Sequence, residues 1–234
     1  MPITKHRQPT FKNNFKNGFC DIFDWNLHVP LVYSNIEQNS IPSVLSTTRI
    51  TKNQHGLCNT NNPIKVPVTI CDDHALDLVC ITETWRTENS LDTTLDGYHS
   101  VRRARNTGKR GGGVLCYINQ SIPCKHWTDL TSTDFETLWL TLRPFRLPRR
   151  YTQIILGVIY HPPNANSFDL SQYICQWLDS LLNRYPKSGI IIAGDFNHFK
   201  DYFITQNYQI RQIVDKPTRS NNILNKVYTY GWHV

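Results

Sequence analysis

The sequence has no long hydrophobic run: none of its 234 residues falls in an uncharged apolar window of about 18 residues, the length that a membrane-spanning helix needs. Its first residues, Met-Pro-Ile-Thr-Lys-His-Arg-Gln, also lack the apolar segment of a signal peptide. Both observations argue against a membrane or secreted protein. We therefore expect an intracellular chain, in the nucleus or the cytoplasm.

Cysteine patterns typical of zinc sites and disulfide frameworks are also missing. The seven cysteines are odd in number and scattered, with no C-x-x-C pair and no metal-ligand spacing with histidine. We expect reduced thiols, several of them packing in strands as small hydrophobic side chains. Neither the G-x-G-x-x-G nor the G-x-x-x-x-G-K-[ST] loop occurs, so these two nucleotide-binding motifs are excluded.

The composition suits one α/β domain with an extension, because 39% hydrophobic and 12% aromatic residues are enough to build a core. The formal charge of +7 favours a polyanionic partner such as nucleic acid. Residues 1–55 are rich in Asn, Lys, Ser, Thr and Pro and keep no regular hydrophobic period. We predict a loosely ordered N-terminal extension over 1–55, in which 22–32 forms a short strand or an interaction segment, and a folded domain over 56–234.

One stretch, Gly189–His198, combines a buried strand with polar side chains at its end. Three consecutive isoleucines predict the strand, and Asp195 and Asn197 follow Gly194 beyond its carboxyl end. Because these two residues are two apart, their carboxylate and amide can converge on one phosphate or one hard cation. Taken alone, the stretch is equally compatible with a Gly-Asp turn that closes a core strand.

Two other predicted strands end in polar side chains in the same way. The apolar run 76–81 is followed by Glu83, and the run 153–160 ends at Tyr160. Glu83 is then either a second acid at the same edge of the sheet or a surface glutamate. The Tyr160 phenol either donates a hydrogen bond to a phosphate oxygen or caps the core.

Residues 102–113 hold five cations followed by three glycines: Arg102, Arg103, Arg105, Lys109 and Arg110. A flexible basic loop of this kind can lie along a phosphate backbone, although a solvated hairpin loop has the same composition. Further strands are predicted at 113–118 and 138–142. The apolar spacing of 170–182 predicts a helix with Ser167 as its N-cap.

Five motifs occur in a characteristic order: Leu-Asp-Leu-Val-Cys-Ile-Thr-Glu-Thr-Trp, Gly-Gly-Gly-Val-Leu-Cys-Tyr-Ile, Gly-Val-Ile-Tyr-His-Pro-Pro, Gly-Asp-Phe-Asn-His and Lys-Pro-Thr-Arg-Ser-Asn-Asn-Ile-Leu. Over about residues 56–230 they resemble the endonuclease/exonuclease/phosphatase superfamily, and more narrowly the apurinic-type endonuclease domain of non-LTR retrotransposons. This resemblance implies an α/β fold, a two-layered β-sandwich flanked by helices (DNase I-like). It also implies Mg²⁺ or Mn²⁺ at one rim, DNA as the substrate and, in the family, fusion to a reverse transcriptase.

The resemblance also implies a role for individual residues. Glu83 corresponds to the metal-binding glutamate, and Asp195 to the aspartate that orients or deprotonates the attacking water. Asn197 corresponds to a phosphate-binding partner, and Tyr160 to the tyrosine that contacts the scissile phosphate. The remaining expected site residues are Asn59 near the metal, and Thr218 and the neighbouring Arg219 near the DNA.

The sequence departs from the family pattern at several points. The family's Asn-Ile-Leu-Asp-Leu reads Asn-Ile-Leu-Asn-Lys here, so Asn225 replaces an aspartate that would orient the catalytic histidine. The sequence stops at Val234 before the closing Ser-Asp-His motif, and we expect the sandwich to lack its last strand or strands. Three interpretations remain: a metal-dependent DNA endonuclease of doubtful activity, an inactive remnant that at most binds nucleic acid, and, as a weaker third, a phosphatase of the same superfamily.

Overall fold

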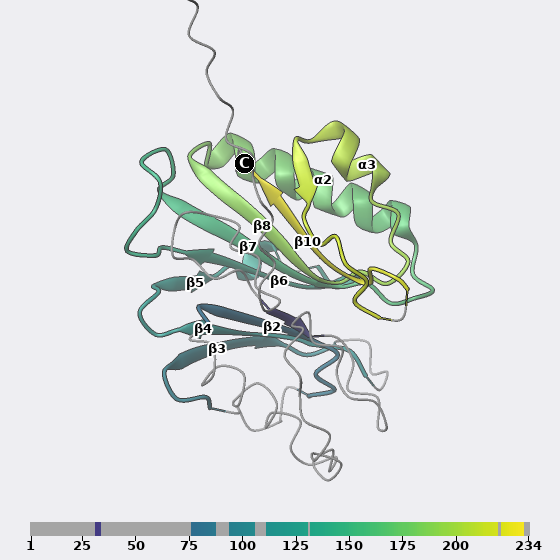
Figure 1. Ribbon diagram of the computed structural model, residues 1–234, viewed down its shortest axis with the longest axis horizontal. Helices are drawn as coiled ribbons and strands as arrows, with labels where there is room; N and C mark the ends of the chain where they lie inside the picture. The colour runs from purple at the N-terminus through teal and green to yellow at the C-terminus, as the bar shows by residue number, and fades with distance from the viewer. Residues whose placement is uncertain are drawn as a thin grey trace, which may run out of the picture.

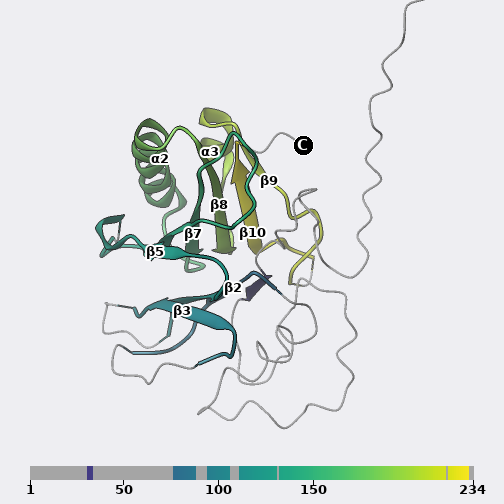
Figure 2. The ribbon, with the colours of Figure 1, turned by 90° about the vertical axis from the view of Figure 1, so that its left-hand side faces the viewer.

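The computed structural model describes residues 31–33, 76–87, 94–105, 111–130, 132–219 and 221–231. Within these ranges the chain forms two β-sheets that pack face to face, with helices on the outer side of the larger sheet (Figures 1 and 2). The smaller sheet has four strands in the order β1 (Leu31–Tyr33), β2 (Leu78–Thr82), β4 (Val114–Asn119) and β3 (Tyr98–Arg103). The larger sheet has six, in the order β5 (Cys124–His126), β6 (Glu136–Leu142), β7 (Gln153–Tyr160), β8 (Ser188–Asp195), β10 (Asn225–Tyr230) and β9 (Ile210–Gln212).

The centre of the larger sheet is made by β7 and β8, which are buried along their whole length. Their runs of isoleucine, leucine and valine suit a strand that is covered on both faces. These two strands are parallel, whereas β6 pairs with β7 and β10 with β8 in the antiparallel sense. Parallel pairing brings the carboxyl ends of β7 and β8 to the same edge of the sheet.

The crossover between β7 and β8 contains helix α2 (Ser167–Arg184), and the short helix α3 (Tyr202–Asn207) follows β8. Helix α2 lays Leu170, Ile174 and Leu178 against the sheet. The prediction that Ser167 caps this helix is wrong: the cap is Asn166, whose side-chain oxygen accepts a hydrogen bond from the Phe168 backbone N–H at 2.9 Å. Asparagine and serine caps are nearly equivalent, which explains the shift of one residue.

Two hydrophobic layers stabilise this arrangement. One lies between the two sheets and includes Cys80 and Cys116, whose Sγ atoms are 3.9 Å apart on neighbouring strands. The other lies between the larger sheet and the helices, around Trp139 and Phe196. The described cysteines are free thiols, as expected, and three of them are buried.

The two-layered α/β sandwich implied by the sequence is confirmed. Helices of the described residues flank its larger sheet only, and the only described part of the predicted 1–55 extension is β1, which pairs with β2. The prediction of a basic loop from residue 102 is wrong at its start, because Arg102 and Arg103 belong to strand β3. Asn59, Lys109 and Arg110 lie outside the described residues, and the boundary at residue 55 stays a prediction.

Candidate active site

Three predicted site residues come from strand ends that meet at one edge of the sandwich. Glu83 directly follows β2 of the smaller sheet, whereas Tyr160 and Asp195 are the last residues of β7 and β8 in the larger sheet. Tyr160 and Asp195 are paired in the β7–β8 register. The site is therefore built across the interface between the two sheets.

The Tyr160 side chain lies between the two acids. Tyr160 is only 6% exposed, and its hydroxyl donates a hydrogen bond to Glu83. Burial raises the pKa of the Tyr160 phenol well above its usual value of 10, and the hydrogen bond to Glu83 and the negative charges of Glu83 and Asp195 raise it further. The Arg105 guanidinium lowers this pKa, but by less. Tyr160 is thus a fixed donor that stays protonated at any physiological pH.

Asp195 and Asn197 are held together by a tight turn. The backbone N–H of Asn197 donates to Asp195 Oδ1 at 3.0 Å, and its side-chain amide donates to the backbone carbonyl of His161 at 2.8 Å. The His161 backbone N–H in turn donates to the Asp195 carbonyl at 2.9 Å. Asn197 has a φ of 44°, which non-glycine residues seldom adopt. The turn therefore fixes the buried Asp195 carboxylate relative to β7.

Glu83 is held by a loop with a comparable local conformation. Glu83 and Trp85 have φ values of 57° and 54°, and the Trp85 backbone N–H donates to the Gly112 carbonyl at 2.8 Å. The indole Nε1 of Trp85 also donates to Glu83 Oε2 at 3.1 Å. Two left-handed positions, separated by one residue and next to one carboxylate, cost about 1–3 kcal/mol each, and such strain is concentrated at functional sites.

An ion pair that the sequence analysis missed borders Tyr160. Arg105 Nε lies 2.5 Å from Glu136 Oε1, the Gly113 backbone N–H donates to Glu136 Oε2 at 2.5 Å, and the Arg105 guanidinium lies over the Tyr160 ring at 5.8 Å. Glu136 is opposite Tyr160 in the β6–β7 pair. The available signal was its position just before the apolar run 138–142, at the same edge of the sheet.

The other predicted nucleic-acid contacts occupy different surroundings. Arg102 donates to the Thr87 carbonyl at 2.8 Å, and Arg103 donates to the carbonyls of Ser132, Phe135 and Thr137. The Thr218 hydroxyl is buried and accepts the backbone N–H groups of Leu224 and Asn225. Arg219 is exposed. The structure thus brings Glu83, Tyr160, Asp195, Asn197 and Arg105 together. Thr218 is linked to this group through Asn225, which is opposite Asp195 in the β8–β10 pair.

The donor set suits a hydrated hard cation better than a closed metal cage. Among the described residues there is no group of three or more His, Cys, Asp or Glu side chains that could hold a metal. Two carboxylates, Glu83 and Asp195, nevertheless act on the same Tyr160 hydroxyl. Mg²⁺ is commonly bound by one or two carboxylates, with water and substrate phosphate as the other ligands. The residues present therefore fit Mg²⁺ or Mn²⁺.

A cleft of about 680 Å³ borders this edge of the larger sheet. Glu136, Tyr160 and His161 line the cleft together with Asn166 and Asp169 at the start of α2, whereas Glu83 and Asp195 are not among its lining residues. The pKa of His161 is lowered by burial, so this imidazole is neutral near pH 7. The cleft gives a substrate access to the Tyr160 side of the site.

Solved structures with the same fold include two groups of enzymes. The endonuclease domain of TRAS1, a telomere-specific non-LTR retrotransposon, superposes with a TM-score of 0.52 at 11% identity, covering 74% of this chain and 82% of that one. Truncated TDP2 of Caenorhabditis elegans gives a TM-score of 0.54 at 10% identity, covering 86% and 84%. A humanized D. rerio TDP2 gives 0.51 at 10%, covering 86% and 81%. At these identities the likeness shows the fold.

Sequence comparison agrees with the fold. No curated protein matches the chain in sequence. The Endonuclease/Exonuclease/phosphatase family, however, matches residues 52–233, which include both sheets from β2 onward and every site residue described above. Members of this family generally use divalent metals. The chain belongs to the Endonuclease/Exonuclease/phosphatase family.

Proposed function

We propose that this chain is a metal-dependent phosphodiesterase domain, a DNA endonuclease of the non-LTR retrotransposon type. The observation that carries the proposal is the meeting of Glu83, Tyr160 and Asp195 across the two sheets. Two acids and one permanently protonated donor beside a cleft are what water attack on a phosphodiester requires. The fold, the family and the likeness to the TRAS1 endonuclease domain agree with it.

Each residue has a distinct task in this reaction. Asp195 orients the attacking water and takes its proton as the new P–O bond forms and the bond to the leaving oxygen breaks. The Tyr160 hydroxyl donates to a non-bridging phosphate oxygen, and Asn197 holds the Asp195 carboxylate in place. Glu83, with Asp195, would hold Mg²⁺, which when bound polarises the phosphate and stabilises the leaving alkoxide.

DNA is the proposed substrate because of the charge of the chain. A formal charge of +7 attracts a polyanion. The exposed Arg219 adds a cation for its backbone, as do Lys109 and Arg110, which lie outside the described residues. A DNA substrate implies that the protein acts in the nucleus or the cytoplasm. Among the described helices, none has the length and apolarity to cross a membrane.

Plasmid nicking by purified residues 1–234 with Mg²⁺ tests the proposal. We expect conversion of supercoiled to open-circular plasmid, with loss of about 10²-fold or more in the Asp195→Ala variant. Asp96→Asn is the matched control, because this exposed acid precedes the Tyr98 end of β3, whereas Glu83 lies at the opposite end of the smaller sheet, and its loss should leave nicking intact. Nicking that survives in Asp195→Ala would mean that the activity does not come from this site.

One observation favours a second function, binding of nucleic acid without turnover. Asn225 stands opposite Asp195 in the β8–β10 pair, where the family pattern has an aspartate, and the described residues provide no third acid for a metal. A remnant of this kind would shift DNA in a gel with a strong salt dependence, and it would not nick plasmid at any Mg²⁺ or Mn²⁺ concentration. Metal-dependent nicking would exclude it.

A further inference from the structure

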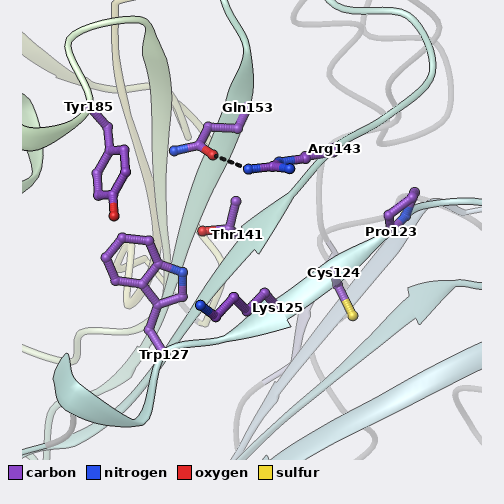
Figure 3. Close-up of a pocket in the computed structure, with 8 residues that line it drawn as sticks. All are labelled: Pro123, Cys124, Lys125, Trp127, Thr141, Arg143, Gln153 and Tyr185. Carbon is purple, nitrogen blue, oxygen red and sulfur yellow. Dashed lines mark hydrogen bonds between the residues drawn. The ribbon is translucent and has the colours of Figure 1, made fainter.

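A second pocket lies at the opposite end of the strands that carry the site. It has a volume of about 230 Å³ and is lined by Pro123, Cys124, Lys125, Trp127, Thr141, Arg143, Gln153 and Tyr185 (Figure 3). Along β6, Thr141 is five residues from Glu136, which corresponds to about 16 Å at the rise of a strand. The pocket is therefore separate from the Tyr160 cluster.

Two buried polar atoms in this pocket have no hydrogen-bond partner. They are the hydroxyl oxygen of Thr141, a residue that is 5% exposed, and the indole Nε1 of Trp127. A buried polar group without a partner is rare in native proteins, and leaving it so costs about 1–3 kcal/mol. Both groups line an open pocket, so a bound molecule can supply the missing partners.

The groups that face the pocket are mostly hydrogen-bond donors. The Trp127 indole nitrogen can only donate, and the Lys125 and Arg143 side chains are cationic donors without acceptor capacity. Lys125 is directly opposite Thr141 in the β5–β6 pair, so the two side chains share one face of the sheet. In the close-up, the Thr141 hydroxyl and the Lys125 ammonium both point toward Trp127 (Figure 3). Such a set selects an anionic acceptor.

Two aromatic rings shape the pocket, and a chain of hydrogen bonds holds the cationic Arg143 side chain in position. Trp127 and Tyr185 pack edge to face, with ring centroids 5.1 Å apart, and form an aromatic wall. Arg143 donates to Gln153 Oε1 at 3.4 Å, and Gln153 Nε2 donates to Ser188 Oγ at 3.1 Å. Gln153 is buried, so this chain of bonds holds the exposed Arg143 at the mouth of the pocket.

We propose that this pocket binds a compact anion attached to a planar ring, with a phosphate or carboxylate as the anionic group. The oxyanion accepts hydrogen bonds from Thr141 and Trp127 and neutralises Lys125 and Arg143, and the ring packs against Trp127 and Tyr185. The small volume excludes larger ligands, because drug-sized molecules occupy about 300–1,000 Å³. Mononucleotides and aromatic carboxylates both have this chemistry.

Isothermal titration of the full chain with four probes tests the proposal. Uridine 5′-monophosphate and benzoate combine a ring with an anion, whereas inorganic phosphate and uridine each lack one of these parts. We expect at least one ring anion to bind about tenfold or more tightly than phosphate or uridine, and the stronger of the two identifies the anionic group. Binding should persist in Asp195→Ala, which separates this site from the proposed nuclease site. Equal affinity for all four probes, or no binding of either ring anion, would overturn the proposal.

Conservative variants locate the binding. Thr141→Val removes one donor while keeping the shape, and Trp127→Phe removes the indole N–H together with part of the ring. Each should weaken binding of the ring anion about tenfold, as should Lys125→Gln. Arg211→Gln is the matched control, because this exposed cation lies in β9 at the other edge of the six-stranded sheet. Thermal unfolding checks that every variant folds. Unchanged affinity in folded Thr141→Val and Lys125→Gln would place the ligand elsewhere and reject the pocket.

Discussion

At the scale of single residues, the proposed site depends most on Tyr160. Its hydroxyl donates to Glu83 and lies within the field of Asp195, and its raised pKa keeps the proton in place. A group of this kind contributes to catalysis as a donor and cannot act as a base. Trp85 provides a second donor to Glu83, so that carboxylate remains oriented when the Tyr160 hydroxyl is removed.

We therefore expect Tyr160→Phe to lower the nicking rate about 10²-fold, because one donor to the transition-state charge is lost. Thermal stability should change little, since the ring still fills the same space. The comparison is Tyr202→Phe, in which the hydroxyl of a tyrosine that is 74% exposed is removed. Equal rates for both variants would show that Tyr160 only caps the core.

The residue scale also marks the limit of sequence reasoning. Glu83, Tyr160 and Asp195 could be found because each follows or ends an apolar run, and the ends of such strands meet at one edge. The Arg105–Glu136 pair could not be found, because its members are 31 positions apart and meet only in the folded sandwich. Its position in the sequence groups Arg105 with the basic loop, whereas in the structure it borders the Tyr160 ring.

At the scale of elements, the strands predicted from sequence are those that are buried on both faces. Strands β2, β4, β6, β7 and β8 carry continuous apolar runs, and their predicted bounds differ from the observed ones by a few residues. The missed strands are β3, which is half-exposed, β10, which begins with the polar residues Asn225 and Lys226, and the three-residue β5 and β9. They form through pairing with a neighbour, and their own sequences carry little signal.

The close contact of β7 with β8 requires Gly194. A Cβ atom at Gly194 would collide with the backbone of Ile159 on β7. We expect Gly194→Ala to lower the free energy of unfolding by about 3 kcal/mol, the upper part of the range for overpacking, and to weaken nicking because Asp195 is the next residue. Urea denaturation measures the first effect and plasmid nicking the second.

Gly97→Ala is the matched control for this element. Gly97 has a φ of 80° but no atom within 4 Å of an added Cβ, so only backbone strain of about 1 kcal/mol opposes the change. If Gly194→Ala and Gly97→Ala lose similar stability, the contact between β7 and β8 does not require a glycine at position 194.

At the scale of the whole molecule, a buried and a half-buried imidazole link stability to pH. Burial lowers the pKa of His161 and, together with the charge of Arg103, that of His126, from an ordinary value of 6.5. Below pH 6.5 the unfolded chain binds protons that the folded chain does not bind. The free energy of unfolding is therefore at its full value above pH 6.5 and falls as the pH drops toward the lowered values.

We expect urea denaturation at about pH 8 and about pH 5.5 to show this loss of stability, and His161→Gln to reduce the difference between the two conditions. His99, which is exposed on the edge strand β3, provides the control through His99→Gln. A pH profile identical in the wild type and in His161→Gln would remove this imidazole from the explanation.

The division of the site between two sheets has a consequence for how the distance between its acids is set. Glu83 belongs to one sheet and Asp195 to the other, and the Arg103 guanidinium of the smaller sheet spans the gap to three carbonyls at the near end of β6. Sideways slip of one layer over the other would change the separation of the two acids without disturbing either layer internally. The side chains that pack between the two sheets therefore help to set the separation of the two acids, because they fix how one layer lies on the other.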